Sequence, residues 1–153
     1  MVVRIQDIGQ GLHSFAHIFL VKCPKCSACA SSYYLDYPNQ EKRFCCTQCG
    51  TAKDGQAIHD LWLQKSCCGQ NLWAYNLDHL AAIEAFVQAK HRERHHLRGY
   101  RNSSLFSRLP KWIQSAKNRD AVLRSVTKLR DSVPSEIQKI QLVDQQALST
   151  RNS

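Results

Sequence analysis

Two short cysteine motifs, CPKC at residues 23–26 and CTQCG at residues 46–50, decide the fold of this chain. Nineteen residues separate the two motifs, counted from Cys26 to Cys46. Two residues between paired cysteines allow a tight turn to direct both sulfurs at one ion about 2.3 Å away. A C-x2-C pair, about 15–20 residues and a second C-x2-C pair are typical of a four-cysteine zinc site. The spacing therefore predicts one structural Zn²⁺ held by Cys23, Cys26, Cys46 and Cys49.

The segments around these motifs have the composition of β-strands. Residues 18–22 precede the first motif, residues 42–45 precede the second, and residues 31–37 form a third strand-like run that ends at Pro38. Two cysteine turns on a small antiparallel sheet resemble the zinc-ribbon family, including the ribbons of transcription-factor type. The resemblance covers about residues 18–52 and implies a sheet that a closed metal site stabilises.

Four further cysteines leave alternatives open. Cys29 offers a competing C-x2-C register with Cys26 and could replace Cys23 as a ligand. Cys45 neighbours Cys46 on a strand, where successive side chains point to opposite faces, so we expect it to be a buried apolar residue. Cys67 and Cys68 lie in a turn between the aromatic runs 61–64 and 72–75, and these two runs predict a hairpin. A second or alternative metal site would use Cys29, His59, Cys67 and Cys68.

The distribution of the eight cysteines indicates a compartment. All of them lie within the first 68 residues of 153, in closely spaced groups, which favours thiolate ligands in a reducing cytoplasm over a disulfide scaffold. The longest apolar run, near residues 15–21, is far shorter than the roughly 18 residues needed to span a bilayer. Asp7, histidines and lysines interrupt the pattern of a secretory leader. We therefore expect a cytoplasmic protein without a membrane segment.

The second half of the chain has helical periodicity. Asn76 is a candidate N-cap, and apolar residues then recur every three to four positions without a breaker until Gly99, which predicts one helix. Ser103 or Ser104 could begin a short turn, and Pro110 suits the first position of another helix. Asn118 is expected to cap a further helix, which Pro134 ends. The apolar stripe of that helix consists of Val122, Val126, Leu129 and Val133.

Charge is concentrated in one segment. The formal net charge is +9, and residues 90–130 hold twelve Lys or Arg against two Asp or Glu. Such a basic segment attracts polyanions, because each neutralised phosphate releases counterions. Arginine also forms bidentate contacts with phosphate. The predicted nucleic-acid-binding residues are Arg92, Arg94, Arg98, Arg101, Arg108, Lys111 and Arg119.

No catalytic motif is present in the sequence. His91 and Glu93 match the H-x-E of zinc deaminases, but that chemistry also requires a downstream P-C-x-x-C, and every cysteine here precedes His91. The sequence holds no P-loop, no G-x-S-x-G and no dinucleotide-binding glycine motif. A four-thiolate zinc is closed to substrate. We therefore expect a protein that is not an enzyme, and the sequence identifies no small-molecule substrate.

A second resemblance covers the chain beyond the ribbon. The runs LWLQ at 61–64, CCG at 67–69, LWAYN at 72–76, HL at 79–80, SRLP at 107–110 and AKNRD at 116–120 are similar to small uncharacterised bacterial proteins that carry a zinc ribbon and a helical tail. The resemblance implies a bacterial cytoplasmic origin and no particular activity.

Together these observations predict an α+β protein, with an N-terminal antiparallel zinc-ribbon β-domain followed by a C-terminal helical domain. The expected divisions are an extension at 1–13, the ribbon with its hairpin at 14–75, the helical domain at 76–148 and a flexible tail at 149–153. The expected function is that of a zinc-stabilised, non-catalytic accessory protein that binds DNA or RNA through its basic segment. The alternative is a regulatory or protein-interaction module that uses the hairpin aromatics or the basic helices.

Overall fold

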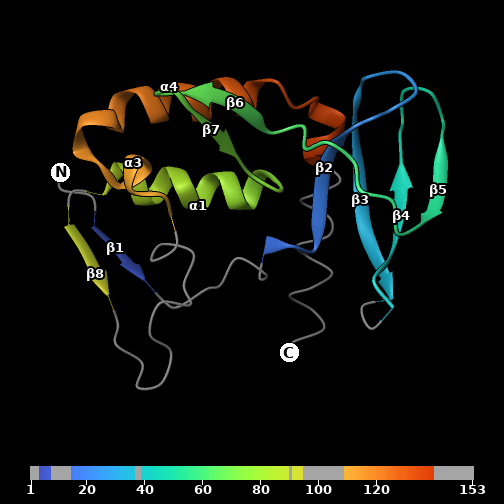
Figure 1. Cartoon of the computed structure of the whole chain (residues 1–153), viewed down its shortest axis with the longest axis horizontal. Helices are drawn as coiled ribbons and strands as arrows, with labels where there is room; N and C mark the ends of the chain where they lie inside the picture. The colour runs from blue at the N-terminus through green and yellow to red at the C-terminus, as the bar shows by residue number, and fades with distance from the viewer. Residues whose placement is uncertain (1–3, 8–14, 37–38, 90, 95–108, 140–153) are drawn as a thin grey trace.

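The structure, a computed structural model, describes residues 4–7, 15–36, 39–89, 91–94 and 109–139, with side chains for all of these except 4–7, 36 and 91–94. A four-stranded sheet forms one end of the molecule, and helices α1 (Leu77–Gln88) and α4 (Arg119–Asp131) lie side by side at the other (Figure 1). The predicted α+β class, with the antiparallel sheet before the helices, is confirmed. No helix within the described ranges is long and apolar enough to cross a lipid bilayer.

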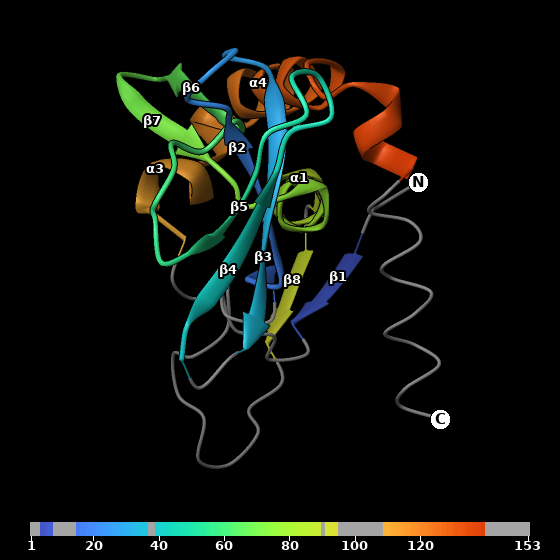
Figure 2. The ribbon, with the colours of Figure 1, turned by 90° about the vertical axis from the view of Figure 1, so that its right-hand side faces the viewer.

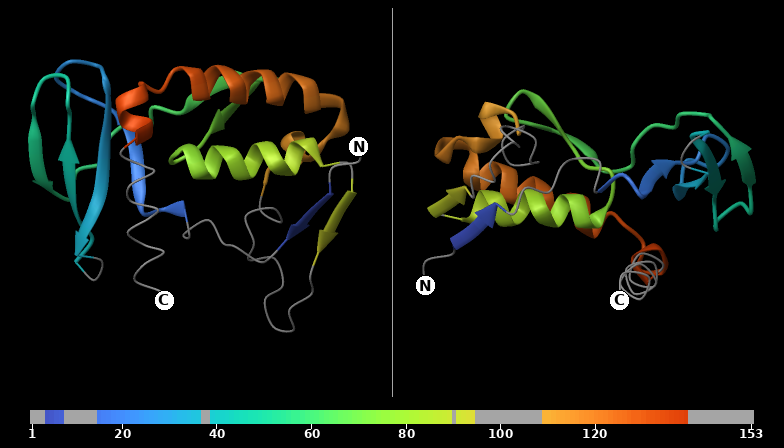
Figure 3. Two further views of the ribbon diagram at one scale, coloured as in Figure 1. Left: turned by 180° about the vertical axis from the view of Figure 1, so that it is seen from behind. Right: turned by 90° about the horizontal axis from the view of Figure 1, so that it is seen from below.

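The sheet is antiparallel throughout, with strand order β2-β3-β4-β5. Figures 2 and 3 show it from further sides. Strand β2 (Ile18–Lys22) has the predicted bounds, whereas β3 (Cys29–Asp36) and β4 (Glu41–Cys45) differ from the prediction by one or two residues at their ends. The fourth strand, β5 (Ala52–Gly55), was not predicted, because its Ala-Lys-Asp-Gly sequence lacks strand-forming residues.

The two edge strands of the sheet, β2 and β5, are protected from further strand pairing in different ways. The outer edge of β2 is covered, because the Trp62 amide donates to the Leu20 carbonyl at 2.9 Å and the Lys22 amide donates to the Asp60 carbonyl at 2.8 Å. The opposite edge is β5, a strand of four residues whose Lys53 and Asp54 are exposed. One edge is thus closed by the chain itself, and the other is short and charged.

The predicted hairpin is present, but its strands β6 (Gln64–Cys67) and β7 (Gln70–Trp73) lie two to three residues nearer the turn than the runs 61–64 and 72–75 that predicted it. Cys68 and Gly69 form its two-residue turn, and both have positive φ, +55° and +75°. Turns of this kind match the right-handed twist of the strands. The hairpin packs against α4, and the Trp62 Nε1–H donates to the Ser132 hydroxyl oxygen at 3.1 Å. The hairpin therefore belongs to the same packed layer as the helices.

Both predicted N-cap asparagines precede helices, but only one of them caps. The side-chain oxygen of Asn76 accepts from the His79 amide at 2.9 Å, at the start of α1. Asn118 precedes α4 without a capping bond and instead donates to the Trp112 carbonyl at 2.8 Å. The helix predicted after Pro110 is present as α3 (Lys111–Gln114), joined to α4 by the 3₁₀ turn η2 (Ala116–Asn118). Residues 135–139, beyond Pro134, form a further helical turn.

The single helix predicted from Asn76 to Gly99 is wrong in its second half. Helix α1 ends at Gln88, Ala89 is extended, and His91–Arg94 form strand β8, which pairs in parallel with β1 (Arg4–Asp7). The reason is that the apolar stripe stops at Val87, and the sequence that follows, Lys-His-Arg-Glu-Arg at 90–94, supplies no apolar residue to continue it. Pairing with β1 satisfies the backbone groups of β8 instead.

Two hydrophobic clusters lie on either side of β2. The larger joins the hairpin, α1, α3 and α4, and it includes Leu20. The smaller is formed by residues of the sheet and of its two cysteine loops, and it includes Val21, next to Leu20 on the same strand. The alternation of side chains along β2 thus serves both clusters. The predicted apolar stripe is confirmed as part of the larger cluster, since Val122, Val126, Leu129 and Val133 are all buried, although α4 ends at Asp131 and Val133 lies just beyond it. Glu84 and Arg130 form an ion pair between α1 and α4.

His79 on α1 makes stability depend on pH. Its side chain is buried, Nδ1 accepts from the Tyr75 amide at 3.0 Å, and burial lowers the pKa of the imidazole to about 4 from 6.5. Near pH 5 only the unfolded chain protonates this imidazole. The free energy of unfolding therefore has its full value, as far as His79 is concerned, above pH 6.5, and it decreases as the pH falls towards 4.

Urea unfolding in excess zinc tests this pH dependence. Between pH 7 and pH 5 the free energy of unfolding of the wild type should fall by about 2 kcal/mol more than that of His79→Gln. Parallel pH profiles of the two proteins would contradict this prediction.

Candidate metal centre

The loop after β2 carries the first cysteine pair and is a tight turn. The Ser27 amide donates to the Cys23 carbonyl at 2.9 Å, and the Cys23 amide donates to the Ala28 carbonyl at 2.8 Å. Ser27 has φ +62°, in the left-handed region. Pro24, directly after Cys23, supplies a fixed φ suited to such a turn.

The loop after β4 repeats this geometry with the second pair. The Gly50 amide donates to the Cys46 carbonyl at 3.0 Å, the Cys46 amide donates to the Thr51 carbonyl at 2.8 Å, and Gly50 has φ +74°. Gly50 and Ser27 occupy equivalent positions, four residues after the first cysteine of each pair. The two loops are therefore closely similar in shape and present their sulfurs in similar ways.

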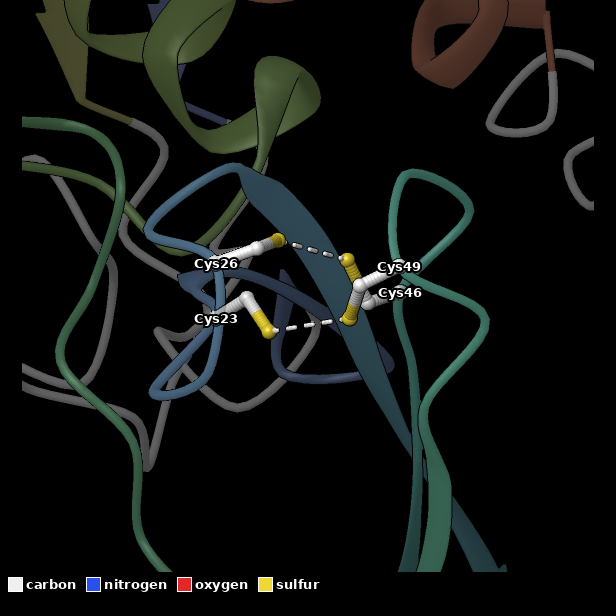
Figure 4. Close-up of side chains that lie close together, drawn as sticks. All are labelled: Cys23, Cys26, Cys46 and Cys49. Atoms are coloured by element: carbon white, nitrogen blue, oxygen red, sulfur yellow. Dashed lines mark hydrogen bonds between the residues drawn. The ribbon is translucent and has the colours of Figure 1, made fainter.

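The four sulfurs of these loops face one another (Figure 4). Cys23 Sγ lies 3.8 Å from Cys49 Sγ, Cys26 Sγ lies 3.5 Å from Cys46 Sγ, and all four atoms are within 4.8 Å of one another. A tetrahedron with metal–sulfur bonds of about 2.3 Å has sulfur–sulfur edges of about 3.8 Å. The cluster can therefore hold one metal ion, and its donor set of four sulfurs suits Zn²⁺ rather than an oxygen-preferring cation.

Hydrogen bonds around the sulfurs favour thiolates unequally. The Thr51 hydroxyl, with its Oγ1 3.1 Å from Cys49 Sγ, and the Thr51 amide lower the pKa of Cys49 to about 6. The Cys26 amide lowers the pKa of Cys23. The Ala28 amide acts in the same direction on Cys26, but burial and the neighbouring thiols raise the pKa of Cys26 to about 12. A cation bound here must displace a proton from Cys26, so metal affinity falls with falling pH.

The structure distinguishes between the two cysteine registers. Cys23 belongs to the cluster and Cys29 does not. Cys29 is buried on β3, where burial raises the pKa of its thiol to about 12. Cys45, next to Cys46, is half-buried on β4 and also lies outside the cluster.

The second metal site considered for Cys29, His59, Cys67 and Cys68 is not assembled. Within the described residues, the four-cysteine cluster is the only group of three or more His, Cys, Asp or Glu side chains that could share a metal ion. The ring of His59 instead lies 4.6 Å from the ring of Phe44. Cys67, the last residue of β6, and Cys68, the first residue of the turn, have their Sγ atoms 3.7 Å apart.

Ser27 offers a test of the first loop. Because a side chain disfavours the left-handed region, Ser27→Gly should stabilise the folded protein by about 0.5–1 kcal/mol. The free energy of unfolding in urea measures this change. Gly50→Ser, at the equivalent position of the second loop, is the matched variant and should destabilise by a similar amount. A loss of stability in Ser27→Gly would contradict this prediction, because it would show that the serine side chain stabilises the loop by more than its left-handed backbone costs.

Few of the predicted nucleic-acid-binding residues can be placed. Lys111 is exposed at the start of α3, whereas Arg119 is half-buried at the start of α4, with its Nε buried and without a hydrogen-bond partner among the described residues. The side chains of Arg92 and Arg94, and the whole of Arg98, Arg101 and Arg108, lie outside the described residues. The predicted set omits three exposed cations of the same region, Lys117, Arg124 and Lys128. The spacing of Arg124 and Lys128, four residues apart on a helix, could have identified that pair.

The chain was compared with models of protein families, with curated proteins and with solved structures, and it matches none of them. The candidate metal centre is supported by the separations of its four sulfurs.

Proposed function

We propose that this chain is a zinc-ribbon protein in which Cys23, Cys26, Cys46 and Cys49 hold one structural Zn²⁺, and that it binds nucleic acid without catalysing a reaction. The arrangement of the four sulfurs carries the first half of the proposal, because their separations fit a tetrahedral ion. Four thiolates fill the coordination sphere of Zn²⁺, so a metal bound here stabilises the fold and has no open position for a substrate.

The charge distribution supports the second half of the proposal. Residues 90–130 hold most of the positive charge of the chain. Within the described part of this segment, Lys111, Lys117, Arg124 and Lys128 are exposed. None of these four forms an ion pair within the described residues. Cations that have no acidic partner among those residues are available for phosphates.

A salt titration tests nucleic-acid binding. Affinity for a single-stranded and a double-stranded probe should fall linearly with salt on a double-logarithmic plot. Arg92→Glu with Arg94→Glu should reduce both the affinity and the slope, by about 0.7–0.9 for each phosphate that the variant no longer neutralises. Lys65→Glu with Lys139→Glu makes the same change in net charge outside the basic segment and should have a smaller effect. Absent or salt-insensitive binding would refute the nucleic-acid half of the proposal.

A further inference from the structure

A groove crosses one face of the ribbon sheet. Its larger hollow has a volume of about 360 Å³ and lies between the sheet and the connection that includes Ile58, His59 and Leu61. A smaller hollow of about 100 Å³ adjoins it, since the two share Ser32, Lys42, Ala57 and His59 as lining residues. The larger hollow alone falls within the range of ligand-binding pockets, about 300–1,000 Å³.

One end of the groove is aromatic. The ring of Phe19 lies 5.8 Å from that of Tyr34 and 5.1 Å from that of Tyr75, and both contacts are edge-to-face. The three residues come from β2, from β3 and from the segment between β7 and α1. Their rings line the larger hollow together with Ile58, whose exposed fraction is 90%. This end therefore offers a flat apolar ligand both aromatic and aliphatic contacts.

Basic side chains border the aromatic end of the groove. Lys42 Nζ lies 5.0 Å from the ring centre of Phe19 and 5.1 Å from that of Tyr34, at the border of the two hollows. Lys53 lines the smaller hollow. Asp54 also lines it, but Arg43 donates to both of its carboxylate oxygens, at 2.8 and 2.9 Å, and neutralises its charge. Neither Lys42 nor Lys53 forms an ion pair within the part of the chain that the structure describes, so the groove presents two lysines next to an aromatic wall.

We propose that this groove binds single-stranded nucleic acid, with a base against Phe19, Tyr34 and Tyr75 and the adjoining phosphates at Lys42 and Lys53. The inference rests on the proposed function and names the form of nucleic acid and the surface that binds it. A base within a duplex is stacked on its neighbours and cannot enter a hollow of this kind, whereas an unpaired base can. An acidic peptide would satisfy the two lysines but would leave the aromatic wall without a planar partner.

The test measures binding of a labelled oligothymidylate to the zinc-loaded full chain at low salt. Tyr34→Leu should weaken binding about tenfold, because the base then has one aromatic ring fewer to pack against. Lys42→Gln should weaken binding and lower the salt slope by about 0.7. The matched controls are Tyr33→Leu and Lys22→Gln, which by strand alternation lie on the opposite face of the sheet and should bind as the wild type does. Pairing the probe with oligodeoxyadenylate should remove the groove-dependent part of the affinity.

The outcomes separate this inference from the proposed function. If the oligonucleotide binds with salt dependence and the groove variants match the wild type, the groove assignment is wrong and the proposed function stands. If neither single-stranded nor double-stranded probe binds, both are wrong. Competition by polyglutamate as effective as that by unlabelled oligonucleotide would also overturn the inference, because it would show that the groove selects charge alone. Circular dichroism and zinc content confirm that each variant is folded.

Discussion

Cys46→Ser should abolish zinc binding and unfold the four-stranded sheet. The smaller cluster, formed by the sheet and its two cysteine loops, consists of Val21, Cys23, Ala30, Phe44 and Cys46, so two of its five buried residues are candidate metal ligands. The other three bury too little apolar surface to offset the conformational entropy of four ordered strands. Zinc binding contributes about 10–16 kcal/mol to the folding of comparable small metal-dependent peptides. Its loss therefore exceeds what this cluster can replace.

Native mass spectrometry and hydrogen exchange measure this effect together. The wild type should carry one zinc and Cys46→Ser none, with loss of amide protection in β3, β4 and β5. Helices α1 and α4 should keep most of their protection, because they pack in the larger cluster. Cys45→Ser is the matched control, because Cys45 is the neighbour of Cys46 and lies outside the four-cysteine cluster. This variant should keep both the zinc and the folded sheet. Equal zinc content in the two variants would refute the assignment of the ligands.

Asn76→Asp should destabilise the protein by about 3–5 kcal/mol at pH 7. The Asn76 side chain is fully buried, and its Nδ2 donates to the Phe15 carbonyl at 2.6 Å and to the Ile18 carbonyl at 2.9 Å. An aspartate keeps the cap at the His79 amide but has no hydrogen to donate. It would also place a buried negative charge against two carbonyl oxygens. Urea unfolding of the zinc-loaded protein measures the loss.

Asn118→Asp is the matched control for this prediction. Asn118 also precedes a helix, but it is only partly buried and donates one side-chain bond, to the Trp112 carbonyl. The cost of the same substitution there should be about 1 kcal/mol. If the two variants were equally destabilised, the buried pair of donated bonds would not be the cause.

Local patterns predicted those elements that local forces stabilise. Strand β2, the Asn76 cap and the α4 stripe each follow from a few neighbouring residues with a clear period. Strand β8 could not be predicted, because its backbone partner β1 lies more than eighty positions earlier in the chain. The packing of the hairpin on α4 was missed for a similar reason, since Trp62 and Ser132 are seventy positions apart. Contacts between distant segments leave no periodic signal in the sequence.

The candidate site shows the same contrast. The four-cysteine cluster could be predicted because the spacing of the two cysteines is set within each loop, and the structure brings together the four predicted sulfurs. The groove could not be predicted, because Phe19, Tyr34, Lys42 and Tyr75 come together only through strand register and through the chain that crosses the sheet. In the sequence these residues are only alternate positions of separate strands, and nothing there shows that they share one face.

The short edge strand β5 affects how the protein behaves at high concentration. An open sheet edge is a template on which a second molecule can add a strand, and this is a common route to aggregation. Here the β2 edge already has partners in Asp60 and Trp62, and Lys53 and Asp54 interrupt β5 with charge. Lys53 would then have two roles, in discouraging self-association and in holding a phosphate. A substitution that makes β5 more apolar would weaken both at once.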